Sequence, residues 1–203
     1  MGSGFLALGD SYTIGEGVNP ADCWPAQLTR ILRQRGIDLQ GITILARTGW
    51  TTFELAEGIA QASLQTPYEL VSLQVGVNNQ YRSLSLRAYR VEFQQLLDQS
   101  IGFAGGEAGR VFVLSIPDWG VTPFADGRDS NRIAAEIDNF NHINRSICTA
   151  GEVKYVDLTA ISRSLGAKPA MLAEDGLHPS SIQYAAWVEL ILPQALKALS
   201  VSA

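Results

Sequence analysis

Five short apolar segments alternate along the chain with longer amphipathic ones. The apolar segments are rich in aliphatic and β-branched residues, and the central ones are nearly continuous rather than alternating. This pattern is typical of strands that are buried on both faces of a parallel sheet. The expected strands cover residues 5–8, 42–45, 70–75, 111–116 and 155–156 with its flanks.

Between these segments, apolar residues recur with the spacing of amphipathic helices. The first such stretch has Pro25 in its first turn, and Gly36 is expected to stop it. The second opens with Thr51 and Glu54, the S/T-x-x-E pattern of a capping box. The last contains Pro193, which is expected to kink or break it. The expected helices cover residues 24–35, 51–64, 86–101, 131–147 and 181–199.

Strands that alternate with helices of this length indicate βαβ units, with helices on both faces of a parallel sheet. No Pro-, Gly- or Ser-rich linker divides the 203 residues, so a single domain over residues 1–203 is expected. In such a sheet, ligands bind at the carboxyl edge, where strands end and loops begin. Ser11, Gly49 and Asn78 each follow one of the first three expected strands.

The composition favours a globular protein with a sizeable core, since 46% of the residues are hydrophobic and 17% are charged. A net charge of −5 without any basic block argues against nucleic-acid binding. No apolar stretch is long enough for stable insertion into a membrane. The first residues carry no export signal, so a cytoplasmic location is the default expectation, and export stays open. The sequence leaves the oligomeric state open.

The cysteines and histidines do not form a metal-binding pattern. Cys23 and Cys148 lack C-x-x-C spacing and have no histidines grouped around them. They are expected to be unpaired thiols in a reducing compartment rather than a disulfide. The two histidines, His142 and His178, are far apart and belong to no metal-ligand grouping, which argues against a metal-dependent hydrolase.

Two short motifs near opposite ends of the chain carry the residues of a nucleophilic site. Ser11 ends a Gly-Asp-Ser tripeptide directly after the first expected strand, and a serine hydroxyl needs a base to become a nucleophile. His178 is the natural base, because it lies in a loop, whereas His142 lies inside an expected helix. Asp175, three residues before His178, can orient the ring in a tight turn, and adjacent Glu174 is the alternative.

Acyl transfer also needs hydrogen-bond donors directed at the negative charge that develops on oxygen. The N–H of Ser11 can supply one donor. Gly49 can supply another, because a residue without Cβ lets the backbone approach a substrate closely. Asn78 can supply a side-chain N–H. Taken singly, each of these residues is better explained as part of an ordinary turn or loop.

The order and spacing of these blocks resemble those of the SGNH hydrolases, also called the GDSL lipase/esterase family. The resemblance runs from Gly9 to Pro179, nearly the whole chain. It implies a flavodoxin-like three-layer α/β/α sandwich with a mostly parallel sheet of five strands. It also implies hydrolysis of an ester or thioester through an acyl-enzyme, without a metal or an organic cofactor.

The same resemblance implies roles for individual residues. Ser11 would be the nucleophile of a catalytic triad, His178 its base and Asp175 the orienting acid. The oxyanion hole would consist of the N–H groups of Ser11 and Gly49 and the side chain of Asn78.

The sequence departs from the family pattern at two positions. Tyr12 follows the serine where the family name records leucine, and this position lies outside the chemistry. Asn79 stands where the third block usually has an acid, which bears on how Asn78 is held.

The expected substrate is a small-molecule ester, either a small acyl ester or a carbohydrate ester. Lysophospholipase or thioesterase activity is the alternative, and a noncatalytic binding protein on the same fold is a third reading. Trp50, Trp119 and Phe124 are expected to line the substrate pocket or, equally, to pack within loops. The chain lacks the phosphate-binding glycine motifs and the G-x-S-x-G motif, which argues against nucleotide-binding proteins and α/β-hydrolases.

Overall fold

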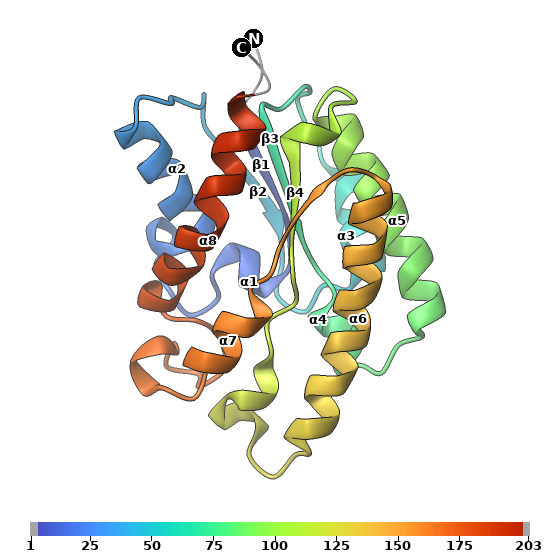
Figure 1. Cartoon of the computed structure of the whole chain (residues 1–203), viewed down its shortest axis with the longest axis vertical. Helices are drawn as coiled ribbons and strands as arrows, with labels where there is room; N and C mark the ends of the chain where they lie inside the picture. Colours follow the sequence, from blue (N-terminus) through green and yellow to red (C-terminus); the bar gives the residue numbers. More distant parts are fainter. Residues whose placement is uncertain (1–3, 201–203) are drawn as a thin grey trace.

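A computed structural model describes residues 4–200, in which five parallel strands form a sheet with the order β2-β1-β3-β4-β5 (Figure 1). Every pair of neighbouring strands is parallel. The predicted five-stranded α/β/α architecture is therefore confirmed. The strands are β1 Phe5–Gly9, β2 Ile42–Ala46, β3 Leu70–Gln74, β4 Val111–Leu114 and β5 Lys154–Val156.

The helices cover both faces of the sheet. On one face α2 packs beside α8, and on the other α5 packs between α3 and α6 (Figure 1). The helices are α1 Ser11–Ile14, α2 Trp24–Gln34, α3 Thr52–Gln61, α4 Val77–Tyr81, α5 Leu86–Phe103, α6 Ser130–Ala150, α7 Thr159–Leu165 and α8 Ser181–Ser200. Short 3-10 turns are η1 Pro20–Asp22, η2 Ala108–Arg110, η3 Trp119–Val121, η4 Pro123–Ala125 and η5 Pro169–Met171.

The long helices match the predicted ones within a few residues, but Pro193 does not break the last one. It lies inside α8, which continues to Ser200. Pro193 removes the hydrogen bond to the carbonyl of Glu189, and both residues are on the exposed side, where water can replace the bond. Buried residues before and after Pro193, such as Trp187 and Ala195, hold the helix against the sheet. The short helices α1, α4 and α7 were not predicted, because one turn is too short to show periodicity.

The central strands are buried on both faces, as their continuous apolar sequences predict. All residues of β1 and β3 are buried, and Phe5 packs against Trp24 on one side and stacks on Phe112 along the sheet. Gly9, the last residue of β1, has no room for a side chain. A Cβ there would lie 2.1 Å from the Thr13 hydroxyl and 2.5 Å from the carbonyl oxygen of Gln74.

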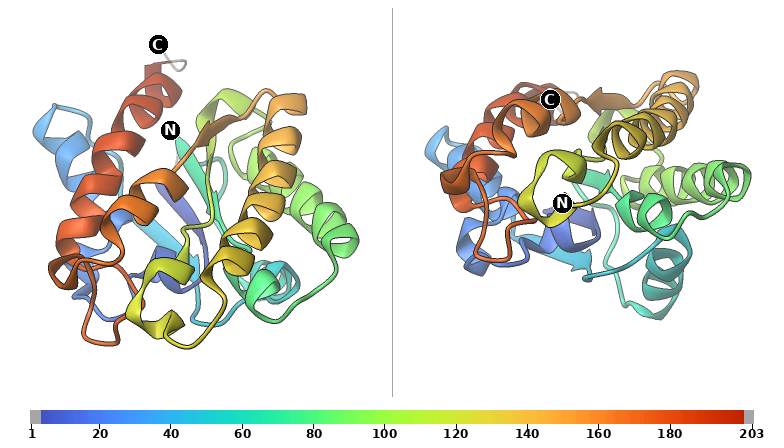
Figure 2. Two further views of the ribbon diagram at one scale, coloured as in Figure 1. Left: turned by 60° about the horizontal axis from the view of Figure 1, so that its bottom comes forward. Right: turned by 90° about the horizontal axis from the view of Figure 1, so that it is seen from below.

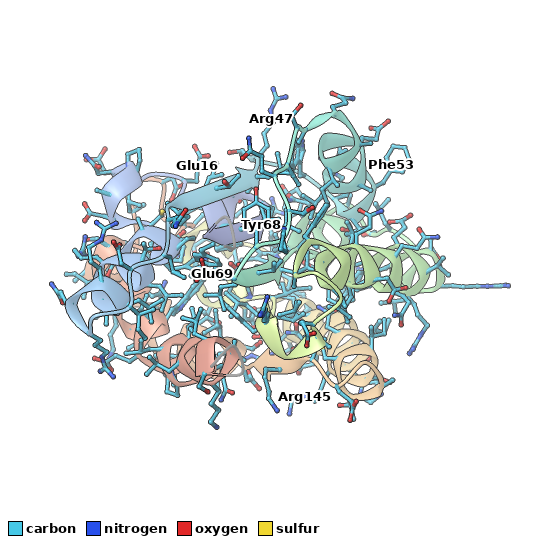
Figure 3. The ribbon with its side chains drawn as sticks, turned by 90° about the horizontal axis from the view of Figure 1, so that it is seen from above. Glu16, Arg47, Phe53, Tyr68, Glu69 and Arg145 are labelled. Atoms are coloured by element: carbon cyan, nitrogen blue, oxygen red, sulfur yellow. The ribbon has the colours of Figure 1, made fainter. Side chains whose placement is uncertain are left out.

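The carboxyl edge of the sheet collects the segments that carry the candidate residues. Gly9 pairs with Ala46 of β2 and with Gln74 of β3, so the three chains leave the sheet at one level. This edge comes forward in the left view of Figure 2 and faces the reader in the right view. Figure 3 shows the opposite edge, where Tyr68 and Glu69 lie just before β3.

Within residues 4–200, no helix combines the length and apolar character needed to cross a membrane. The expectation about an export signal concerns the first residues of the chain, and residues 1–3 lie outside the described residues. Cys23 and Cys148 are both buried and unpaired, as predicted. Burial raises the pKa of the Cys148 thiol to about 12 and also raises that of Cys23.

Candidate active site

Ser11, His178 and Asp175 form a continuous line of hydrogen-bonding groups at the carboxyl edge. The hydroxyl oxygen of Ser11, the first residue of α1, lies 2.9 Å from Nε2 of His178. Nδ1 of His178 lies 2.6 Å from a carboxylate oxygen of Asp175. His178 is 7% exposed and Ser11 is 5% exposed, so this contact is shielded from solvent. Two motifs separated by most of the chain are therefore brought together as the sequence predicted.

Asp175 orients His178 through the backbone as well as the side chain. Its second carboxylate oxygen accepts the N–H groups of Leu177 and His178, both at 2.9 Å. Burial disfavours the ionised carboxylate, but hydrogen bonds from the His178 side chain and from both N–H groups outweigh it, so the pKa of Asp175 is lowered. The neighbouring Glu174 is exposed, and Asp175 is the residue that contacts the ring.

Tyr12 packs against the imidazole of His178. Its ring centroid lies 5.3 Å from that of His178 and 6.1 Å from that of Trp187 on α8. Tyr12 is 4% exposed. The aromatic residue that replaces the family's leucine thus forms part of the wall that holds the histidine in place.

The three candidate oxyanion donors line one cavity of about 190 Å³ together with the hydroxyl of Ser11 and the ring of His178. Among residues 4–200, the N–H groups of Ser11 and Gly49 donate no hydrogen bond. One N–H of the Asn78 amide donates to the carbonyl of Trp50 at 3.0 Å. That bond fixes the amide plane and leaves its second N–H for another acceptor.

Gly49 occupies a position that glycine favours strongly. The N–H of Trp50 donates to the carbonyl of Arg47 at 3.2 Å, which closes a turn over residues 47–50. Gly49 is the third residue of this turn and has a φ of +83°, a value that side chains disfavour. The turn directly follows β2 and brings the Gly49 backbone to the cavity.

Asn79 takes the place of an acid by donating a hydrogen bond as well as accepting one. Its side-chain oxygen accepts the N–H of Thr52 at 3.0 Å, and its Nδ2 donates to the Thr52 hydroxyl at 2.7 Å. The same hydroxyl donates its own proton to the carboxylate of Glu92. The hydroxyl of Thr52 has only this one proton, so the residue at position 79 must donate a hydrogen bond to the hydroxyl oxygen. An amide can donate such a bond, whereas a carboxylate cannot.

Three aromatic residues form one side of the cavity: Tyr81, Trp119 and Phe124. Of the three aromatic residues that the sequence offered as pocket wall or loop packing, Trp119 and Phe124 line the cavity and Trp50 does not. Its indole packs on Gly58 of α3, where a Cβ would lie 2.4 Å from the ring. Tyr81 was missed, because its position in the unpredicted helix α4 gave no sign of its direction.

Hydrogen bonds from two helices fix the orientation of Trp119. Its indole N–H donates to the side-chain oxygen of Gln80 at 2.8 Å, and the Gln80 amide donates to Glu136 of α6 at 2.8 Å. Arg128 stands over the aromatic group, with its guanidinium carbon 5.2, 5.3 and 5.4 Å from the three ring centroids. Such cation–π contacts hold rings of separate segments together.

Asp10 is a buried carboxyl group that links the first block of the site, at Ser11, to the third block, at Asn78. It caps the N-terminus of α1, where its side chain accepts the N–H of Tyr12 at 3.1 Å. The N–H of Gly76, just before α4, also donates to it. Burial raises the pKa of Asp10 to about 7, although these N–H groups favour the ionised form.

The described part of the chain contains no group of three or more His, Cys, Asp or Glu side chains that could hold a metal ion.

Comparison with known proteins identifies the family. Residues 7–186 match the GDSL-like lipase/acylhydrolase family. The chain belongs to this family and is an ester-hydrolysing enzyme. Comparison with curated proteins gave no match.

Solved structures share the fold at low sequence identity. TesA is 18% identical, with a TM-score of 0.74 over 96% of this chain and 98% of its own. The psychrotrophic esterase EstA from Pseudoalteromonas sp., inhibited by monoethylphosphonate, is 14% identical, with a TM-score of 0.76 over 98% of this chain and 99% of its own. The W215I variant of Axe2, an acetyl xylan esterase from Geobacillus stearothermophilus, is 19% identical, with a TM-score of 0.73 over 97% of each chain.

Asp10 is expected to make the fold less stable as the pH rises. The unfolded chain releases this proton near pH 3.8, whereas the folded protein holds it up to about pH 7. The folded state therefore binds more protons in this window, and the free energy of unfolding falls as the pH rises through it, by roughly 2–4 kcal/mol. Asp10→Asn retains an acceptor for Tyr12 but cannot titrate, so this part of the decline should disappear.

Urea unfolding of the wild type and of Asp10→Asn at several values between pH 5 and pH 8 measures the effect. The comparison uses the slope against pH, because the amide can shift the absolute stability. Equal slopes in the two proteins would contradict the assignment.

Proposed function

We propose that the protein hydrolyses carboxylic esters through a triad of Ser11, His178 and Asp175. The observation that carries this proposal is the line of contacts from the Ser11 hydroxyl through both ring nitrogens of His178 to Asp175, 2.9 and 2.6 Å long, in which the contact between Ser11 and His178 is buried. The lowered pKa of Asp175 keeps its carboxylate ionised beside the imidazolium that forms during the reaction.

The proposed reaction has two halves. The Ser11 oxygen attacks the ester carbonyl carbon while its proton passes to Nε2 of His178, and the tetrahedral intermediate collapses with loss of the alcohol, which takes that proton. A water molecule then gives a proton to His178 and attacks the acyl-enzyme. Collapse of the second intermediate releases the carboxylic acid and returns the proton to Ser11.

The N–H groups of Ser11 and Gly49 and the free N–H of Asn78 are the proposed oxyanion donors. Three features support this role: all three residues line the cavity, the two backbone groups lack an acceptor among the described residues, and Asn78 is held by the carbonyl of Trp50. Donors that are fixed before the reaction stabilise the developing charge without reorganising.

The proposed substrate is a small acyl ester or a carbohydrate ester. A cavity of about 190 Å³ with the rings of Tyr81, Trp119 and Phe124 on one side suits a short acyl group and a flat or ring-shaped alcohol. The fold is shared with the acetyl xylan esterase Axe2, which makes acetylated sugars a natural first class to test. Lysophospholipids and acyl thioesters are the competing substrates.

Ser11→Ala is expected to abolish turnover and leave the fold intact, because it removes only the nucleophilic hydroxyl. Hydrolysis of p-nitrophenyl acetate by the wild type and the variant, with thermal unfolding as the control, tests this. Labelling by a fluorophosphonate should disappear in the variant as well. Undiminished turnover in Ser11→Ala would remove this residue from the mechanism, and a wild type that neither turns over nor becomes labelled would favour a noncatalytic role.

Asn78→Ala is expected to lower kcat by a factor on the order of 10²–10³, as the loss of one oxyanion donor does in other enzymes. KM should change little, because the bond strengthens mainly in the transition state. Steady-state kinetics with p-nitrophenyl acetate measure both constants. A change confined to KM would mean that Asn78 only binds the substrate.

The aromatic side of the cavity is expected to favour short acyl groups. The ratio of kcat/KM for p-nitrophenyl acetate to that for the octanoate should be about 10 or more, and Trp119→Ala should lower this ratio severalfold because it removes the largest ring from the wall. Phe53→Ala is a matched control, since Phe53 is 58% exposed and points outward from α3 (Figure 3). A wild type that prefers the octanoate would instead favour a lysophospholipase or a long-chain thioesterase.

A further inference from the structure

The Gly49 turn is attached to α4 by two hydrogen bonds to successive carbonyl groups. Asn78 donates to the carbonyl of Trp50 at 3.0 Å, and Nη2 of Arg82 donates to the carbonyl of Gly49 at 2.6 Å. Arg82 directly follows α4 and is its C-terminal cap residue. Two proposed oxyanion donors that come from different strands are thus joined by short polar contacts.

Arg82 is itself held by a second, rigid partner. Its Nη1 lies 3.1 Å from Oε1 of Glu54 on α3. The other carboxylate oxygen of Glu54 accepts the N–H and the hydroxyl of Thr51, both at 2.8 Å, in the capping box predicted from the sequence. The Thr51 N–H and hydroxyl and Arg82 lower the pKa of Glu54 against the effect of burial, so Glu54 stays ionised and attracts the guanidinium.

The forked shape of the guanidinium matters here. One nitrogen of Arg82 binds the carboxylate of Glu54 on α3, and another binds the carbonyl of Gly49. Within the turn over residues 47–50, the backbone hydrogen bond is the one from Trp50 to Arg47. Gly49 has more backbone freedom than other residues, so its N–H direction depends on such external contacts. On the other side of the turn, Thr48 donates to Glu16, which also restrains it.

We infer that Arg82 is a positioning residue, which holds the Gly49 carbonyl and thereby aims the Gly49 N–H at the oxyanion. This inference rests on the proposed function of the same cavity. Arg82 acts through the backbone of Gly49. Its side chain is about half exposed, and surface ion pairs of this kind contribute little to stability, so its effect should appear in catalysis rather than in folding.

Arg82→Met keeps the aliphatic stem and removes both contacts. We expect kcat for p-nitrophenyl acetate to fall about 10- to 100-fold with KM changed less than about threefold, because the oxyanion donor loses its alignment mainly in the transition state. Labelling of Ser11 by a fluorophosphonate should slow by a similar factor. The pH profile of kcat/KM should keep its shape, since the contact between His178 and Asp175 is untouched.

Arg82→Lys keeps a charge and the stem but lacks the fork, so it should have intermediate activity. Because this variant preserves surface charge, it decides the question even if the methionine variant unfolds. Addition of guanidinium at low millimolar concentration to Arg82→Ala should restore part of kcat. Arg145→Met is the matched control and should have no effect on kcat. Arg145 forms an exposed ion pair with Asp157 at 2.8 Å and lies across the molecule from Arg47, which begins the turn of Gly49 (Figure 3).

The outcomes separate this inference from the proposed function. Wild-type turnover that depends on Ser11, together with full kcat in Arg82→Met or Arg82→Lys, would overturn the role of Arg82 alone. A loss in kcat and in labelling rate, with an unchanged unfolding temperature and pH profile, would support it. Failure of the wild type itself to show turnover or labelling that depends on Ser11 would overturn the proposed function, and the role of Arg82 with it.

Discussion

The in-register pairing of β1 with its two neighbours is the constraint on which the site depends. Gly9 lies level with Ala46 and Gln74, so the chain leaves three adjacent strands at the same height. Ser11 follows at once, Gly49 three residues after β2 and Asn78 four residues after β3. A shift of one residue in either pairing would move one of these segments along the sheet and turn its side chains to the other face.

Polar contacts then convert this coarse alignment into fixed geometry. The buried carboxyl of Asp10 holds the start of α1 and accepts the N–H of Gly76, which ties the serine to the turn before α4. Asn79 joins α4 to the start of α3, and its amide matches a threonine hydroxyl whose proton is committed to Glu92. Asn79, which stands where the family has an acid, is therefore matched to the pair of Thr52 and Glu92. A change of Asn79 or of Glu92 would leave a buried polar group without its hydrogen-bond partner.

The sequence predicted the strands for a physical reason, because continuous apolar runs are typical of strands buried on both faces. It also placed Ser11, Gly49 and Asn78 after strand ends and His178 before the last helix, and the structure brings these four residues to one cavity. What it did not predict were features that depend on side-chain direction. Trp50 lies in the turn after β2 and Tyr81 ends the short helix α4, yet only Tyr81 lines the cavity. The capping-box glutamate was found, but nothing in its local pattern indicated that it would bind an arginine 28 residues later.

The loop that carries His178 is closed on itself by a bridge between Leu172 and Pro179 and by the turn at Asp175. The base and its carboxylate therefore form as one local unit, and only the contact with Ser11, 167 residues away, must be made over a long distance. The loop is followed by α8, which packs against α2. During synthesis on the ribosome, Ser11 emerges 167 residues before His178. The growing chain consequently cannot make the contact between Ser11 and His178 until the loop that carries His178 has been synthesised.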